Sequence, residues 1–336
     1  MHAVRLHAFG PAENLTYEHT QDPVPAPGQV RIAVAAAGVH VLDTALRQGM
    51  TGPYPAPVEL PTIPGREVAG TVESLGEGTD PSWLGKRVVA HLGMVPGGYA
   101  ELAVTDAARL HEIPAGLDEA EAVAMIGTGR TTLGILQFTR LGPDDIAVVP
   151  AAAGGIGTLL VQYAKNAGAA VIGLAGGPAK VARTAANGAD LAVDYTLPDW
   201  SEQVRAHLRD RLGGRGATVV FDSVGGATGR AAVDLLAEGG LHLVFGWSGE
   251  GLLDGSPLTF TEEELAERGI TSESVLGPVM IRKAGGDLRV LEERALAEAA
   301  AGRLRPAVQR FRLADAAWAH GALETRGTMG KVVLEP

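Results

Sequence analysis

A glycine-rich turn at residues 151–157, with the sequence AAAGGIG, is the first feature of this chain that could do chemistry. It follows an apolar stretch and precedes a helical pattern at 157–168. Gly154 and Gly157 match the second and third glycines of the G-x-G-x-x-G fingerprint, and Ala152 stands in place of the first. Backbone N–H groups and the helix dipole at such a turn favour a phosphate. In this context the turn predicts a dinucleotide site.

The residues after the next apolar stretch, 169–175, bear on which dinucleotide binds. NAD-binding domains usually place an acidic residue at the end of this strand, where it binds the ribose hydroxyls. Here the strand is followed by Gly176 and Gly177, and then by Lys180 and Arg183, with no acid among residues 176–183. Cations without a carboxylate suit a 2′-phosphate, so the sequence favours NADPH over NADH. The alternative is that both cations are solvated helix residues.

Two patterns divide the chain and would position these residues. Residues 1–121 contain short β-like runs separated by Gly and Pro, which suggests a barrel-like β domain. In residues 122–264 apolar strands alternate with helices, which predicts a parallel sheet covered on both faces. Residues 265–336 contain an amphipathic helix at 287–304 and end in a strand, GKVVLEP, that we expect to return to the first domain. The expected strands before it are 29–39, 66–76, 85–93, 97–106, 145–151, 169–175, 191–195, 217–225 and 240–249.

The composition narrows the class of protein. The 336 residues hold 28 Lys and Arg against 39 Asp and Glu, and this net charge of -11 argues against nucleic acid or an anionic membrane as a partner. The absence of cysteine excludes disulfides, thiol nucleophiles and Cys-based zinc sites. The N-terminus lacks the pattern of a signal peptide, and the apolar runs are too short to span a bilayer, so we expect a cytoplasmic protein.

Several motifs together resemble one family. In chain order they are PGREVAGTVESLG, GKRVVA, GGYAEL, the glycine turn with its helix, VVFDSVGG and TMGKVVLEP. This order is similar to the medium-chain dehydrogenase/reductase superfamily, and within it to the zinc-independent quinone oxidoreductase (zeta-crystallin-like) branch, over essentially the whole chain. The resemblance implies an α/β fold, in which a GroES-like catalytic domain is built from both termini and a Rossmann domain lies between. It also implies a homodimer joined through edge strands of the Rossmann sheets.

The positions that bind zinc in zinc-dependent relatives carry other residues here. The first ligand position is His40, the second is Arg66, and the segment IGTGRTT at 126–132 offers no third ligand. A catalytic zinc needs about three protein ligands. We therefore expect no metal.

The cofactor positions of the family carry over to this chain residue by residue. The resemblance implies that Lys180 and Tyr195 contact the 2′-phosphate of NADPH, although a packed tyrosine at a strand end is the alternative for Tyr195. The positions with an implied cofactor role are Thr44, Thr131, Gly154, Gly155, Ile156, Gly157, Gly176, Lys180, Tyr195, Ser223, Val224, Phe245, Gly246, Trp247 and Arg326.

His40 and Asp43 are the candidate catalytic residues. His40 is either a general acid, since imidazole titrates near neutral pH, or a contact of the nicotinamide at a position where relatives usually carry Asn. Asp43 suits an orienting or structural carboxylate better than a base. Relatives also carry Asn at Trp247 and Tyr at Leu133, so the departures lie on the acceptor side of the site.

The resemblance implies an NADPH-dependent reductase that transfers hydride to a small molecule, either a quinone or an activated enone. An enoyl reductase of a polyketide-type pathway is an alternative within the same chemistry. An alternative from another class is a non-catalytic NADPH-binding, crystallin-like protein.

Overall fold

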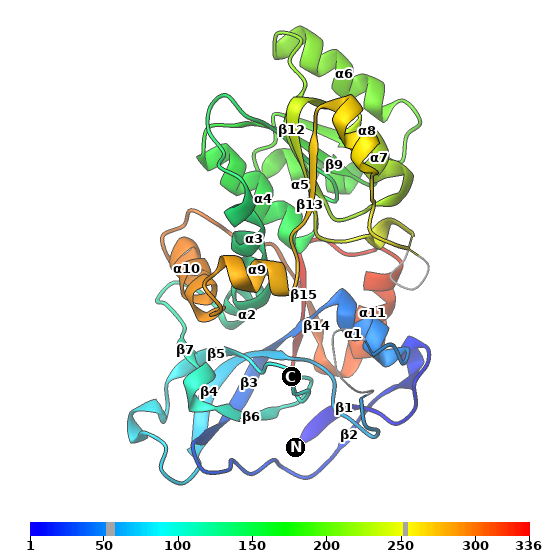
Figure 1. The fold of residues 1–336 in the computed structure, drawn as a ribbon. Coiled ribbons are helices and arrows are strands. Elements are labelled where there is room, and N and C mark those ends of the chain that lie inside the picture. Colours follow the sequence, from blue (N-terminus) through cyan, green and yellow to red (C-terminus); the bar gives the residue numbers. More distant parts are fainter. Residues whose placement is uncertain (52–57, 251–254) are drawn as a thin grey trace. The chain divides into compact units, whose positions relative to one another are not determined.

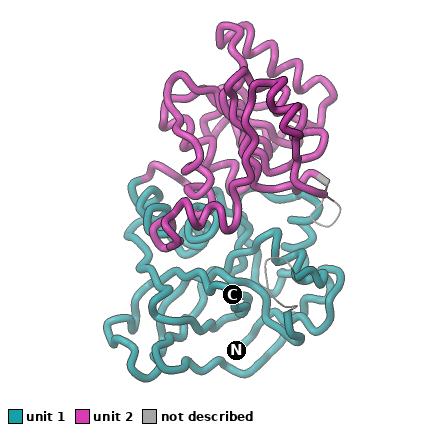
Figure 2. The backbone as a smooth tube through the Cα atoms, in the orientation of Figure 1, with its two compact units in different colours: residues 1–129, 292–301, 306–336 teal, residues 130–291, 302–305 magenta. Residues whose placement is uncertain are grey.

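The computed structural model describes residues 1–51, 58–250 and 255–336 (Figure 1). The chain folds into two compact units (Figure 2). Unit 1 comprises residues 1–129, 292–301 and 306–336, and unit 2 comprises residues 130–291 and 302–305. No described helix is long and apolar enough to cross a bilayer.

Unit 1 is built on a seven-stranded sheet in the order β14-β15-β3-β4-β5-β7, in which β6 also pairs with β3. The last strand, β15, pairs antiparallel with β3, so residues 331–335 lie in the same sheet as β3, β4 and β5. Alternating apolar side chains of β3, such as Val30, Ile32 and Val34, enter the core of this unit. The sheet strands are β3 (Gln29–Val39), β4 (Glu67–Leu75), β5 (Arg87–His91), β6 (Leu102–Asp106), β7 (His111–Glu112), β14 (Val308–Arg312) and β15 (Lys331–Glu335).

The remaining elements of unit 1 are a hairpin and short helices. β1 (His2–Leu6) and β2 (Leu15–His19) pair antiparallel. The helices are α1 (Val41–Arg47), α2 (Glu119–Ala124) and α11 (Ala316–Glu324), together with most of α10 (Arg289–Ala300). A π-helical turn, Met125–Gly129, follows α2 directly. Such turns are rare and often lie at functional sites.

Unit 2 is a six-stranded parallel sheet in the order β10-β9-β8-β11-β12-β13. The chain runs outward from β8 through β9 to β10 and then returns to β11 on the other side of β8. Ligands of such sheets bind at the carboxyl ends of the strands, where the order reverses. The strands are β8 (Ile146–Val149), β9 (Ala170–Ala175), β10 (Leu191–Asp194), β11 (Ala217–Asp222), β12 (Leu236–Val244) and β13 (Thr271–Ser274).

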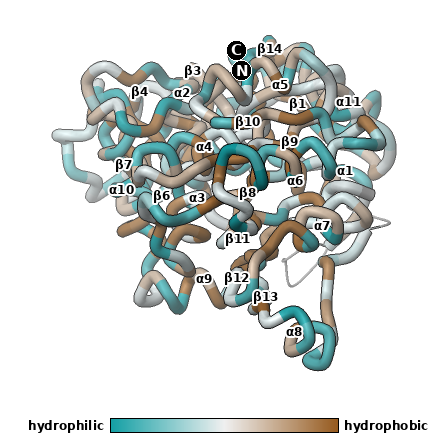
Figure 3. The backbone as a smooth tube through the Cα atoms, turned by 90° about the horizontal axis from the view of Figure 1, so that it is seen from above, coloured by the Kyte–Doolittle hydropathy of each residue, from teal (hydrophilic) through white to brown (hydrophobic). Residues whose placement is uncertain are grey.

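Helices connect these strands, as parallel pairing requires. The central strands β8, β9 and β11 are apolar and almost wholly buried, whereas α8 is hydrophilic and has no buried residue (Figure 3). The helices are α3 (Arg130–Ile135), α4 (Gly155–Asn166), α5 (Pro178–Ala186), α6 (Trp200–Arg211), α7 (Gly226–Val233), α8 (Glu262–Arg268) and α9 (Pro278–Lys283).

The division of the chain differs from the expected boundary after residue 264. β13 pairs with β12, and α9 contributes Met280 to the packing around Gly134. Residues 265–291 therefore lie in unit 2 rather than in the unit that carries both termini. The sequence TSES of β13 is too short and polar to be read as a strand.

Candidate active site

The glycine turn precedes α4 at the carboxyl end of β8. Ala151 has a left-handed backbone, with φ 51°, and Gly154 is the N-cap of α4. A Cβ at Gly157 would lie 2.3 Å from the carbonyl oxygen of Ala151 and 2.7 Å from the Cα of Ala152, so only glycine fits there. The N–H groups of the first turn of α4 have no partner within the helix, and they are the groups that would bind a phosphate.

The ends of β9 and β10 bring together the residues predicted to discriminate between the two cofactors. Tyr195 donates its backbone N–H to the carbonyl of Ala175, at 3.1 Å. A Cβ at Gly176 would lie 3.4 Å from the hydroxyl oxygen of Tyr195. Lys180 is half-buried in the first turn of α5, after Gly177 with φ 87°. A 2′-phosphate role for Lys180 and Tyr195 stays a prediction.

Asp194, the last residue of β10, is a nearby acid that the sequence argument missed. Its carboxylate accepts hydrogen bonds from the N–H of Gly177 and from the N–H and hydroxyl of Thr196. The hydroxyl of Thr196 comes first among the causes that lower the pKa of Asp194, ahead of the two backbone donors. The dinucleotide fingerprint places the acid at the end of β9, whereas this carboxylate comes from the neighbouring strand.

The loops after β11 and β12 carry the predicted nicotinamide-side residues and lie against each other. A Cβ at Gly246 would lie 2.9 Å from the carbonyl oxygen of Ser223. Asp222 organises this corner: its Oδ1 accepts the N–H groups of Val224 and Gly225, each at 2.9 Å. Its Oδ2 lies 3.2 Å from Nε2 of the buried His242. Phe245 and Trp247 follow β12, and Thr131 lies in α3 of the same unit.

Three predicted residues of unit 1, in addition to His40, have local roles in the structure. The hydroxyl of Thr44 donates to the carbonyl of Val41, at 2.7 Å. Asp43 is buried, and its Oδ2 accepts the backbone N–H of His40, at 2.8 Å, at the start of α1. Arg326 is exposed and has a left-handed backbone, with φ 58°. The cofactor roles of Thr44 and Arg326 stay predictions, and the contacts of Asp43 favour an orienting role.

His40 lies in a cluster with two buried charges, Glu67 of β4 and Lys331 of β15. Nε2 of His40 is 2.6 Å from Oε1 of Glu67, and Nζ of Lys331 is 2.8 Å from both Oε2 of Glu67 and Nε2 of His40. The side chains of Glu67 and Lys331 are 0% and 4% exposed, whereas that of His40 is 25% exposed. We call these three residues the His40 cluster. Only His40 reaches solvent appreciably.

The charges in the His40 cluster keep Glu67 ionised. Burial by itself raises the pKa of Glu67, but the charges of His40 and Lys331 outweigh it and hold the pKa well below 4.5. Two glycines make room for the carboxylate. A Cβ at Gly38 would lie 2.4 Å from Oε2 of Glu67, and a Cβ at Gly127, in the π-helical turn, would lie 1.5 Å from Oε1.

Behind α1, a second buried chain of polar groups runs from His320 through Tyr99 to Asp43. The hydroxyl of Tyr99 donates to Oδ2 of Asp43, at 3.1 Å, and its oxygen lies 3.1 Å from Nε2 of His320. Burial, together with the charge of Asp43, raises the pKa of Tyr99 well above 10. Tyr99 therefore holds its proton, and the chain fixes Asp43 and the start of α1.

Burial also lowers the pKa of His320 to about 4, with Asp43 partly opposing it. The unfolded chain, in which His titrates near 6.5, binds more protons between these values, so the free energy of unfolding falls as the pH drops from 6.5 to 4. The loss in the free energy of unfolding is roughly 3 kcal/mol if the whole pKa difference between the folded and unfolded states contributes. Urea unfolding of the wild type and of His320→Gln across this range tests it: the variant should show a flatter dependence. The exposed His19→Gln is the control, and equal slopes in all three would contradict the assignment.

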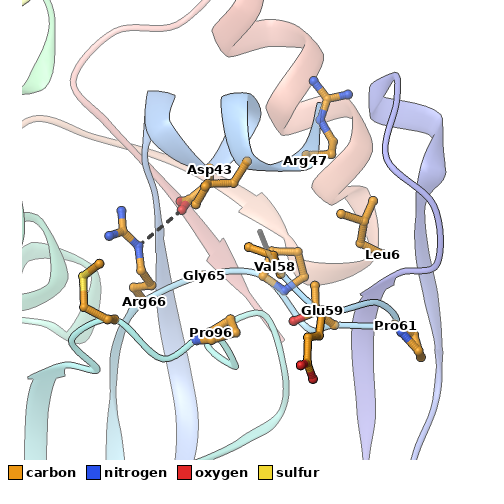
Figure 4. Close-up of a pocket in the computed structure, with 13 residues that line it drawn as sticks. Leu6, Asp43, Arg47, Val58, Glu59, Pro61, Gly65, Arg66 and Pro96 are labelled. Carbon is orange, nitrogen blue, oxygen red and sulfur yellow. Dashed lines mark ion pairs between the residues drawn. The ribbon is translucent and has the colours of Figure 1, made fainter. Parts of the chain in front are cut away.

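A pocket of about 540 Å³ opens in unit 1 beside Arg66 and Asp43 (Figure 4). Nε of Arg66 is 3.7 Å from Oδ1 of Asp43, so these two charges pair at one end of the pocket. The apolar lining residues are Leu6, Leu46, Val58, Pro61, Pro64, Met94 and Pro96. The lining also contains Asp43, Arg47, Glu59, Thr62 and Arg66, so the pocket combines apolar walls with charged groups and has the size of a small-molecule site.

Comparisons with known proteins agree with this fold. The alcohol dehydrogenase GroES-like domain matches residues 26–115, and the zinc-binding dehydrogenase domain matches residues 155–278. A quinone oxidoreductase of Pseudomonas aeruginosa is 33% identical over 342 residues, which cover 99% of each chain. A 2-haloacrylate reductase of a Burkholderia species is 32% identical over 99% of this chain and 98% of its own. The crystal structure of Escherichia coli quinone oxidoreductase complexed with NADPH has a TM-score of 0.83 at 28% identity, over 100% of both chains.

These matches and the sheet order define the class of protein. The chain belongs to the medium-chain dehydrogenase/reductase superfamily and, within it, to the quinone oxidoreductase branch. The family resemblance inferred from the motifs is therefore confirmed, and so is the α/β fold with a GroES-like domain and a Rossmann sheet.

The residues of the His40 cluster do not fit the zinc that the second domain's name suggests. A catalytic zinc takes about three protein ligands, and no group of three metal-binding side chains was found among the described residues. The two nearest donors, His40 and Glu67, already contact the ammonium of Lys331. A zinc ion using both donors would meet this buried positive charge.

Proposed function

We propose that this protein is a zinc-independent oxidoreductase that transfers hydride from NADPH to a quinone or an activated enone. An NADPH-dependent oxidoreductase is what membership in the branch implies, and the structure of the Escherichia coli relative contains NADPH. The observation that carries the proposal is the group of glycine and polar residues at the carboxyl ends of β8, β9 and β10. That edge offers a phosphate-binding turn and a lysine, and NADPH supplies the hydride.

Each predicted cofactor residue has a role in this proposal. The turn at 154–157 binds the pyrophosphate, and Gly176, Lys180 and Tyr195 bind the 2′-phosphate. The loops after β11 and β12 shape the nicotinamide side. The last group comprises Ser223, Val224, Phe245, Gly246 and Trp247, with Thr44, Thr131 and Arg326 as further contacts.

The acceptor side is supported by the pocket of unit 1 and by the His40 cluster. The apolar lining suits a flat conjugated acceptor. The electron-rich product needs a proton or a donor, and His40 is the exposed member of its cluster. We further propose a homodimer that forms through β13, which is an edge strand of its sheet.

The acceptor is tested by following NADPH oxidation with para-benzoquinone, phenanthrenequinone, a 2-haloacrylate and a 2-enoyl thioester under matched conditions. We expect turnover with a quinone or with the 2-haloacrylate, and full activity after dialysis against EDTA. The haloacrylate belongs in the panel because a relative of equal coverage is a 2-haloacrylate reductase. Turnover of the thioester alone would favour an enoyl reductase. NADPH binding without any turnover would favour a crystallin-like binding protein, and loss of activity with EDTA would contradict zinc independence.

A further inference from the structure

The His40 cluster joins one partly exposed imidazole to a carboxylate and an ammonium that solvent scarcely reaches. We propose that Glu67 and Lys331 are positioning residues that hold His40 through Nε2 and balance its two protonation states, so that Nδ1 delivers the proton that follows hydride transfer. This inference rests on the proposed reductase function. Lys331, which contacts both His40 and Glu67, belongs to β15.

The contacts of Nε2 require two alternative arrangements. Nε2 is 2.8 Å from Nζ of Lys331, which can only donate, and 2.6 Å from Oε1 of Glu67, which as a carboxylate can only accept. One nitrogen cannot accept from Lys331 and donate to Glu67 at the same time. In the neutral ring at rest, Nε2 accepts from Lys331 and the proton is on Nδ1. In the imidazolium, Nε2–H donates to Glu67 and both nitrogens carry protons.

The two buried charges therefore favour opposite states of His40. The carboxylate of Glu67 stabilises the imidazolium, and the ammonium of Lys331 stabilises the neutral ring. Buried ion pairs contribute little net stability, because desolvation offsets their attraction. The cluster nevertheless has space made for it by two glycines, Gly38 and Gly127, where a Cβ would collide with the Glu67 carboxylate. Because a buried ion pair adds little net stability, a cluster for which two glycines leave space fits a functional role better than a stabilising one.

The proton balance is complete with the groups named. Hydride transfer moves one hydrogen and two electrons from NADPH to the acceptor, which leaves NADP⁺ and, from a quinone, a hydroquinone anion. Nδ1 of the His40 imidazolium then gives its proton to the anionic oxygen. The product is the neutral hydroquinone, and the ring is left for the moment as the Nε2–H tautomer, which still donates to Glu67. Water restores the proton to Nδ1.

Other titratable groups surround the cluster and must be included in any test. His91 faces Glu67 from β5, in register with it. The charge of Glu67 contributes to the raised pKa of Tyr99, and Asp43 accepts the backbone N–H of His40. None of the variants below changes these three residues.

The direct test is an NMR titration of the His40 ring in the protein without cofactor or acceptor, assigned by comparison with His40→Asn. In Glu67→Gln the midpoint should move to lower pH, and in Lys331→Met to higher pH, each by about 1 or more, as expected for charges this close. The double variant Glu67→Gln/Lys331→Met, which buries no lone charge, should return toward the wild type and remains usable if a single variant does not fold. Shifts of both single variants in one direction, or no shift, would overturn the inference.

A matched control is available in a second His–carboxylate pair of unit 1, which is largely buried. Nε2 of His111 lies 3.0 Å from Oε2 of Glu292. Glu292→Gln should change the signals of His111 and leave the titration of His40 in place. A shift of His40 in this control equal to that in Glu67→Gln would mean that the effect is a general loosening of the unit.

Kinetics then connects the cluster to turnover. With a quinone, the midpoint of kcat against pH should follow the NMR midpoint in each variant, while the KM for NADPH stays within about 2-fold. If the NMR midpoint of His40 moves in a variant and the midpoint of kcat against pH does not, the proton role is overturned. Absence of turnover with every acceptor would overturn the proposed function, whereas the NMR titration would still decide whether the cluster balances His40.

Discussion

Lys180→Glu should raise the KM for NADPH by about 100-fold or more and change that for NADH by less than about 3-fold. The substitution replaces the cation in the first turn of α5 with a carboxylate, which would repel the 2′-phosphate in a site where direct charge contacts contribute several kcal/mol. Steady-state kinetics with both cofactors and direct titration of NADPH binding measure the difference. Equal effects on the two cofactors would contradict the assignment of Lys180.

Two further variants sharpen this test. Arg209→Glu makes the same charge reversal at an exposed residue in the last turn of α6, and it should leave both KM values unchanged. Asp194→Asn removes the acid that contacts Gly177. If Asp194 only holds the turn, this variant weakens both cofactors alike. If its carboxylate binds the ribose instead, NADH alone is weakened and the preference predicted from Lys180 is wrong.

Gly127→Ala should lower the free energy of unfolding by roughly 3–5 kcal/mol, because the added methyl group would occupy the position of the Glu67 carboxylate and separate it from Lys331. A Cβ at this residue would lie 1.5 Å from Oε1, closer than any non-bonded contact. Chemical unfolding measures the loss, and the His40 titration should change together with it.

Gly321→Ala is the matched control for this substitution. Gly321 lies inside α11, and a Cβ there meets no atom within 4 Å. The same chemical change should stabilise the protein by about 0.5–1 kcal/mol, since alanine favours a helix over glycine. An equal gain in stability in both variants would show that the crowding around Glu67 relaxes without cost.

The parallel sheet was the part of the fold most readable from the sequence. Long apolar runs at 145–151 and 169–175 separate from helical patterns clearly, and they correspond to β8 and β9. The glycine turn was identifiable because its spacing is a steric requirement, which the 2.3 Å approach of a Cβ at Gly157 makes explicit. β13 was missed because its four residues are mainly polar, so that only pairing with β12 makes them a strand.

The candidate site in unit 1 was only partly predictable. His40 was found by its residue type, but its partners Glu67 and Lys331 are 27 and 291 positions away, and only the antiparallel pairing of β15 with β3 and of β3 with β4 brings them together. The contact between Tyr99 and His320 could not be predicted either, since no local sequence pattern connects the two residues. A Lys or Glu in a short strand suggests a surface residue until the sheet order is known.

The return of β15 to the first sheet also has a consequence for synthesis on the ribosome. β15 lies between β14 and β3 in the sheet, so its place is an interior one that stays vacant until residues 331–335 have emerged. Residues 130–291, by contrast, are complete much earlier and can form the parallel sheet first. Until β15 has emerged, Glu67 has no lysine counterion. Assembly of the His40 cluster therefore depends on β15, and a chain that lacked this strand would leave Glu67 without its lysine counterion and would leave the edge of β3 open.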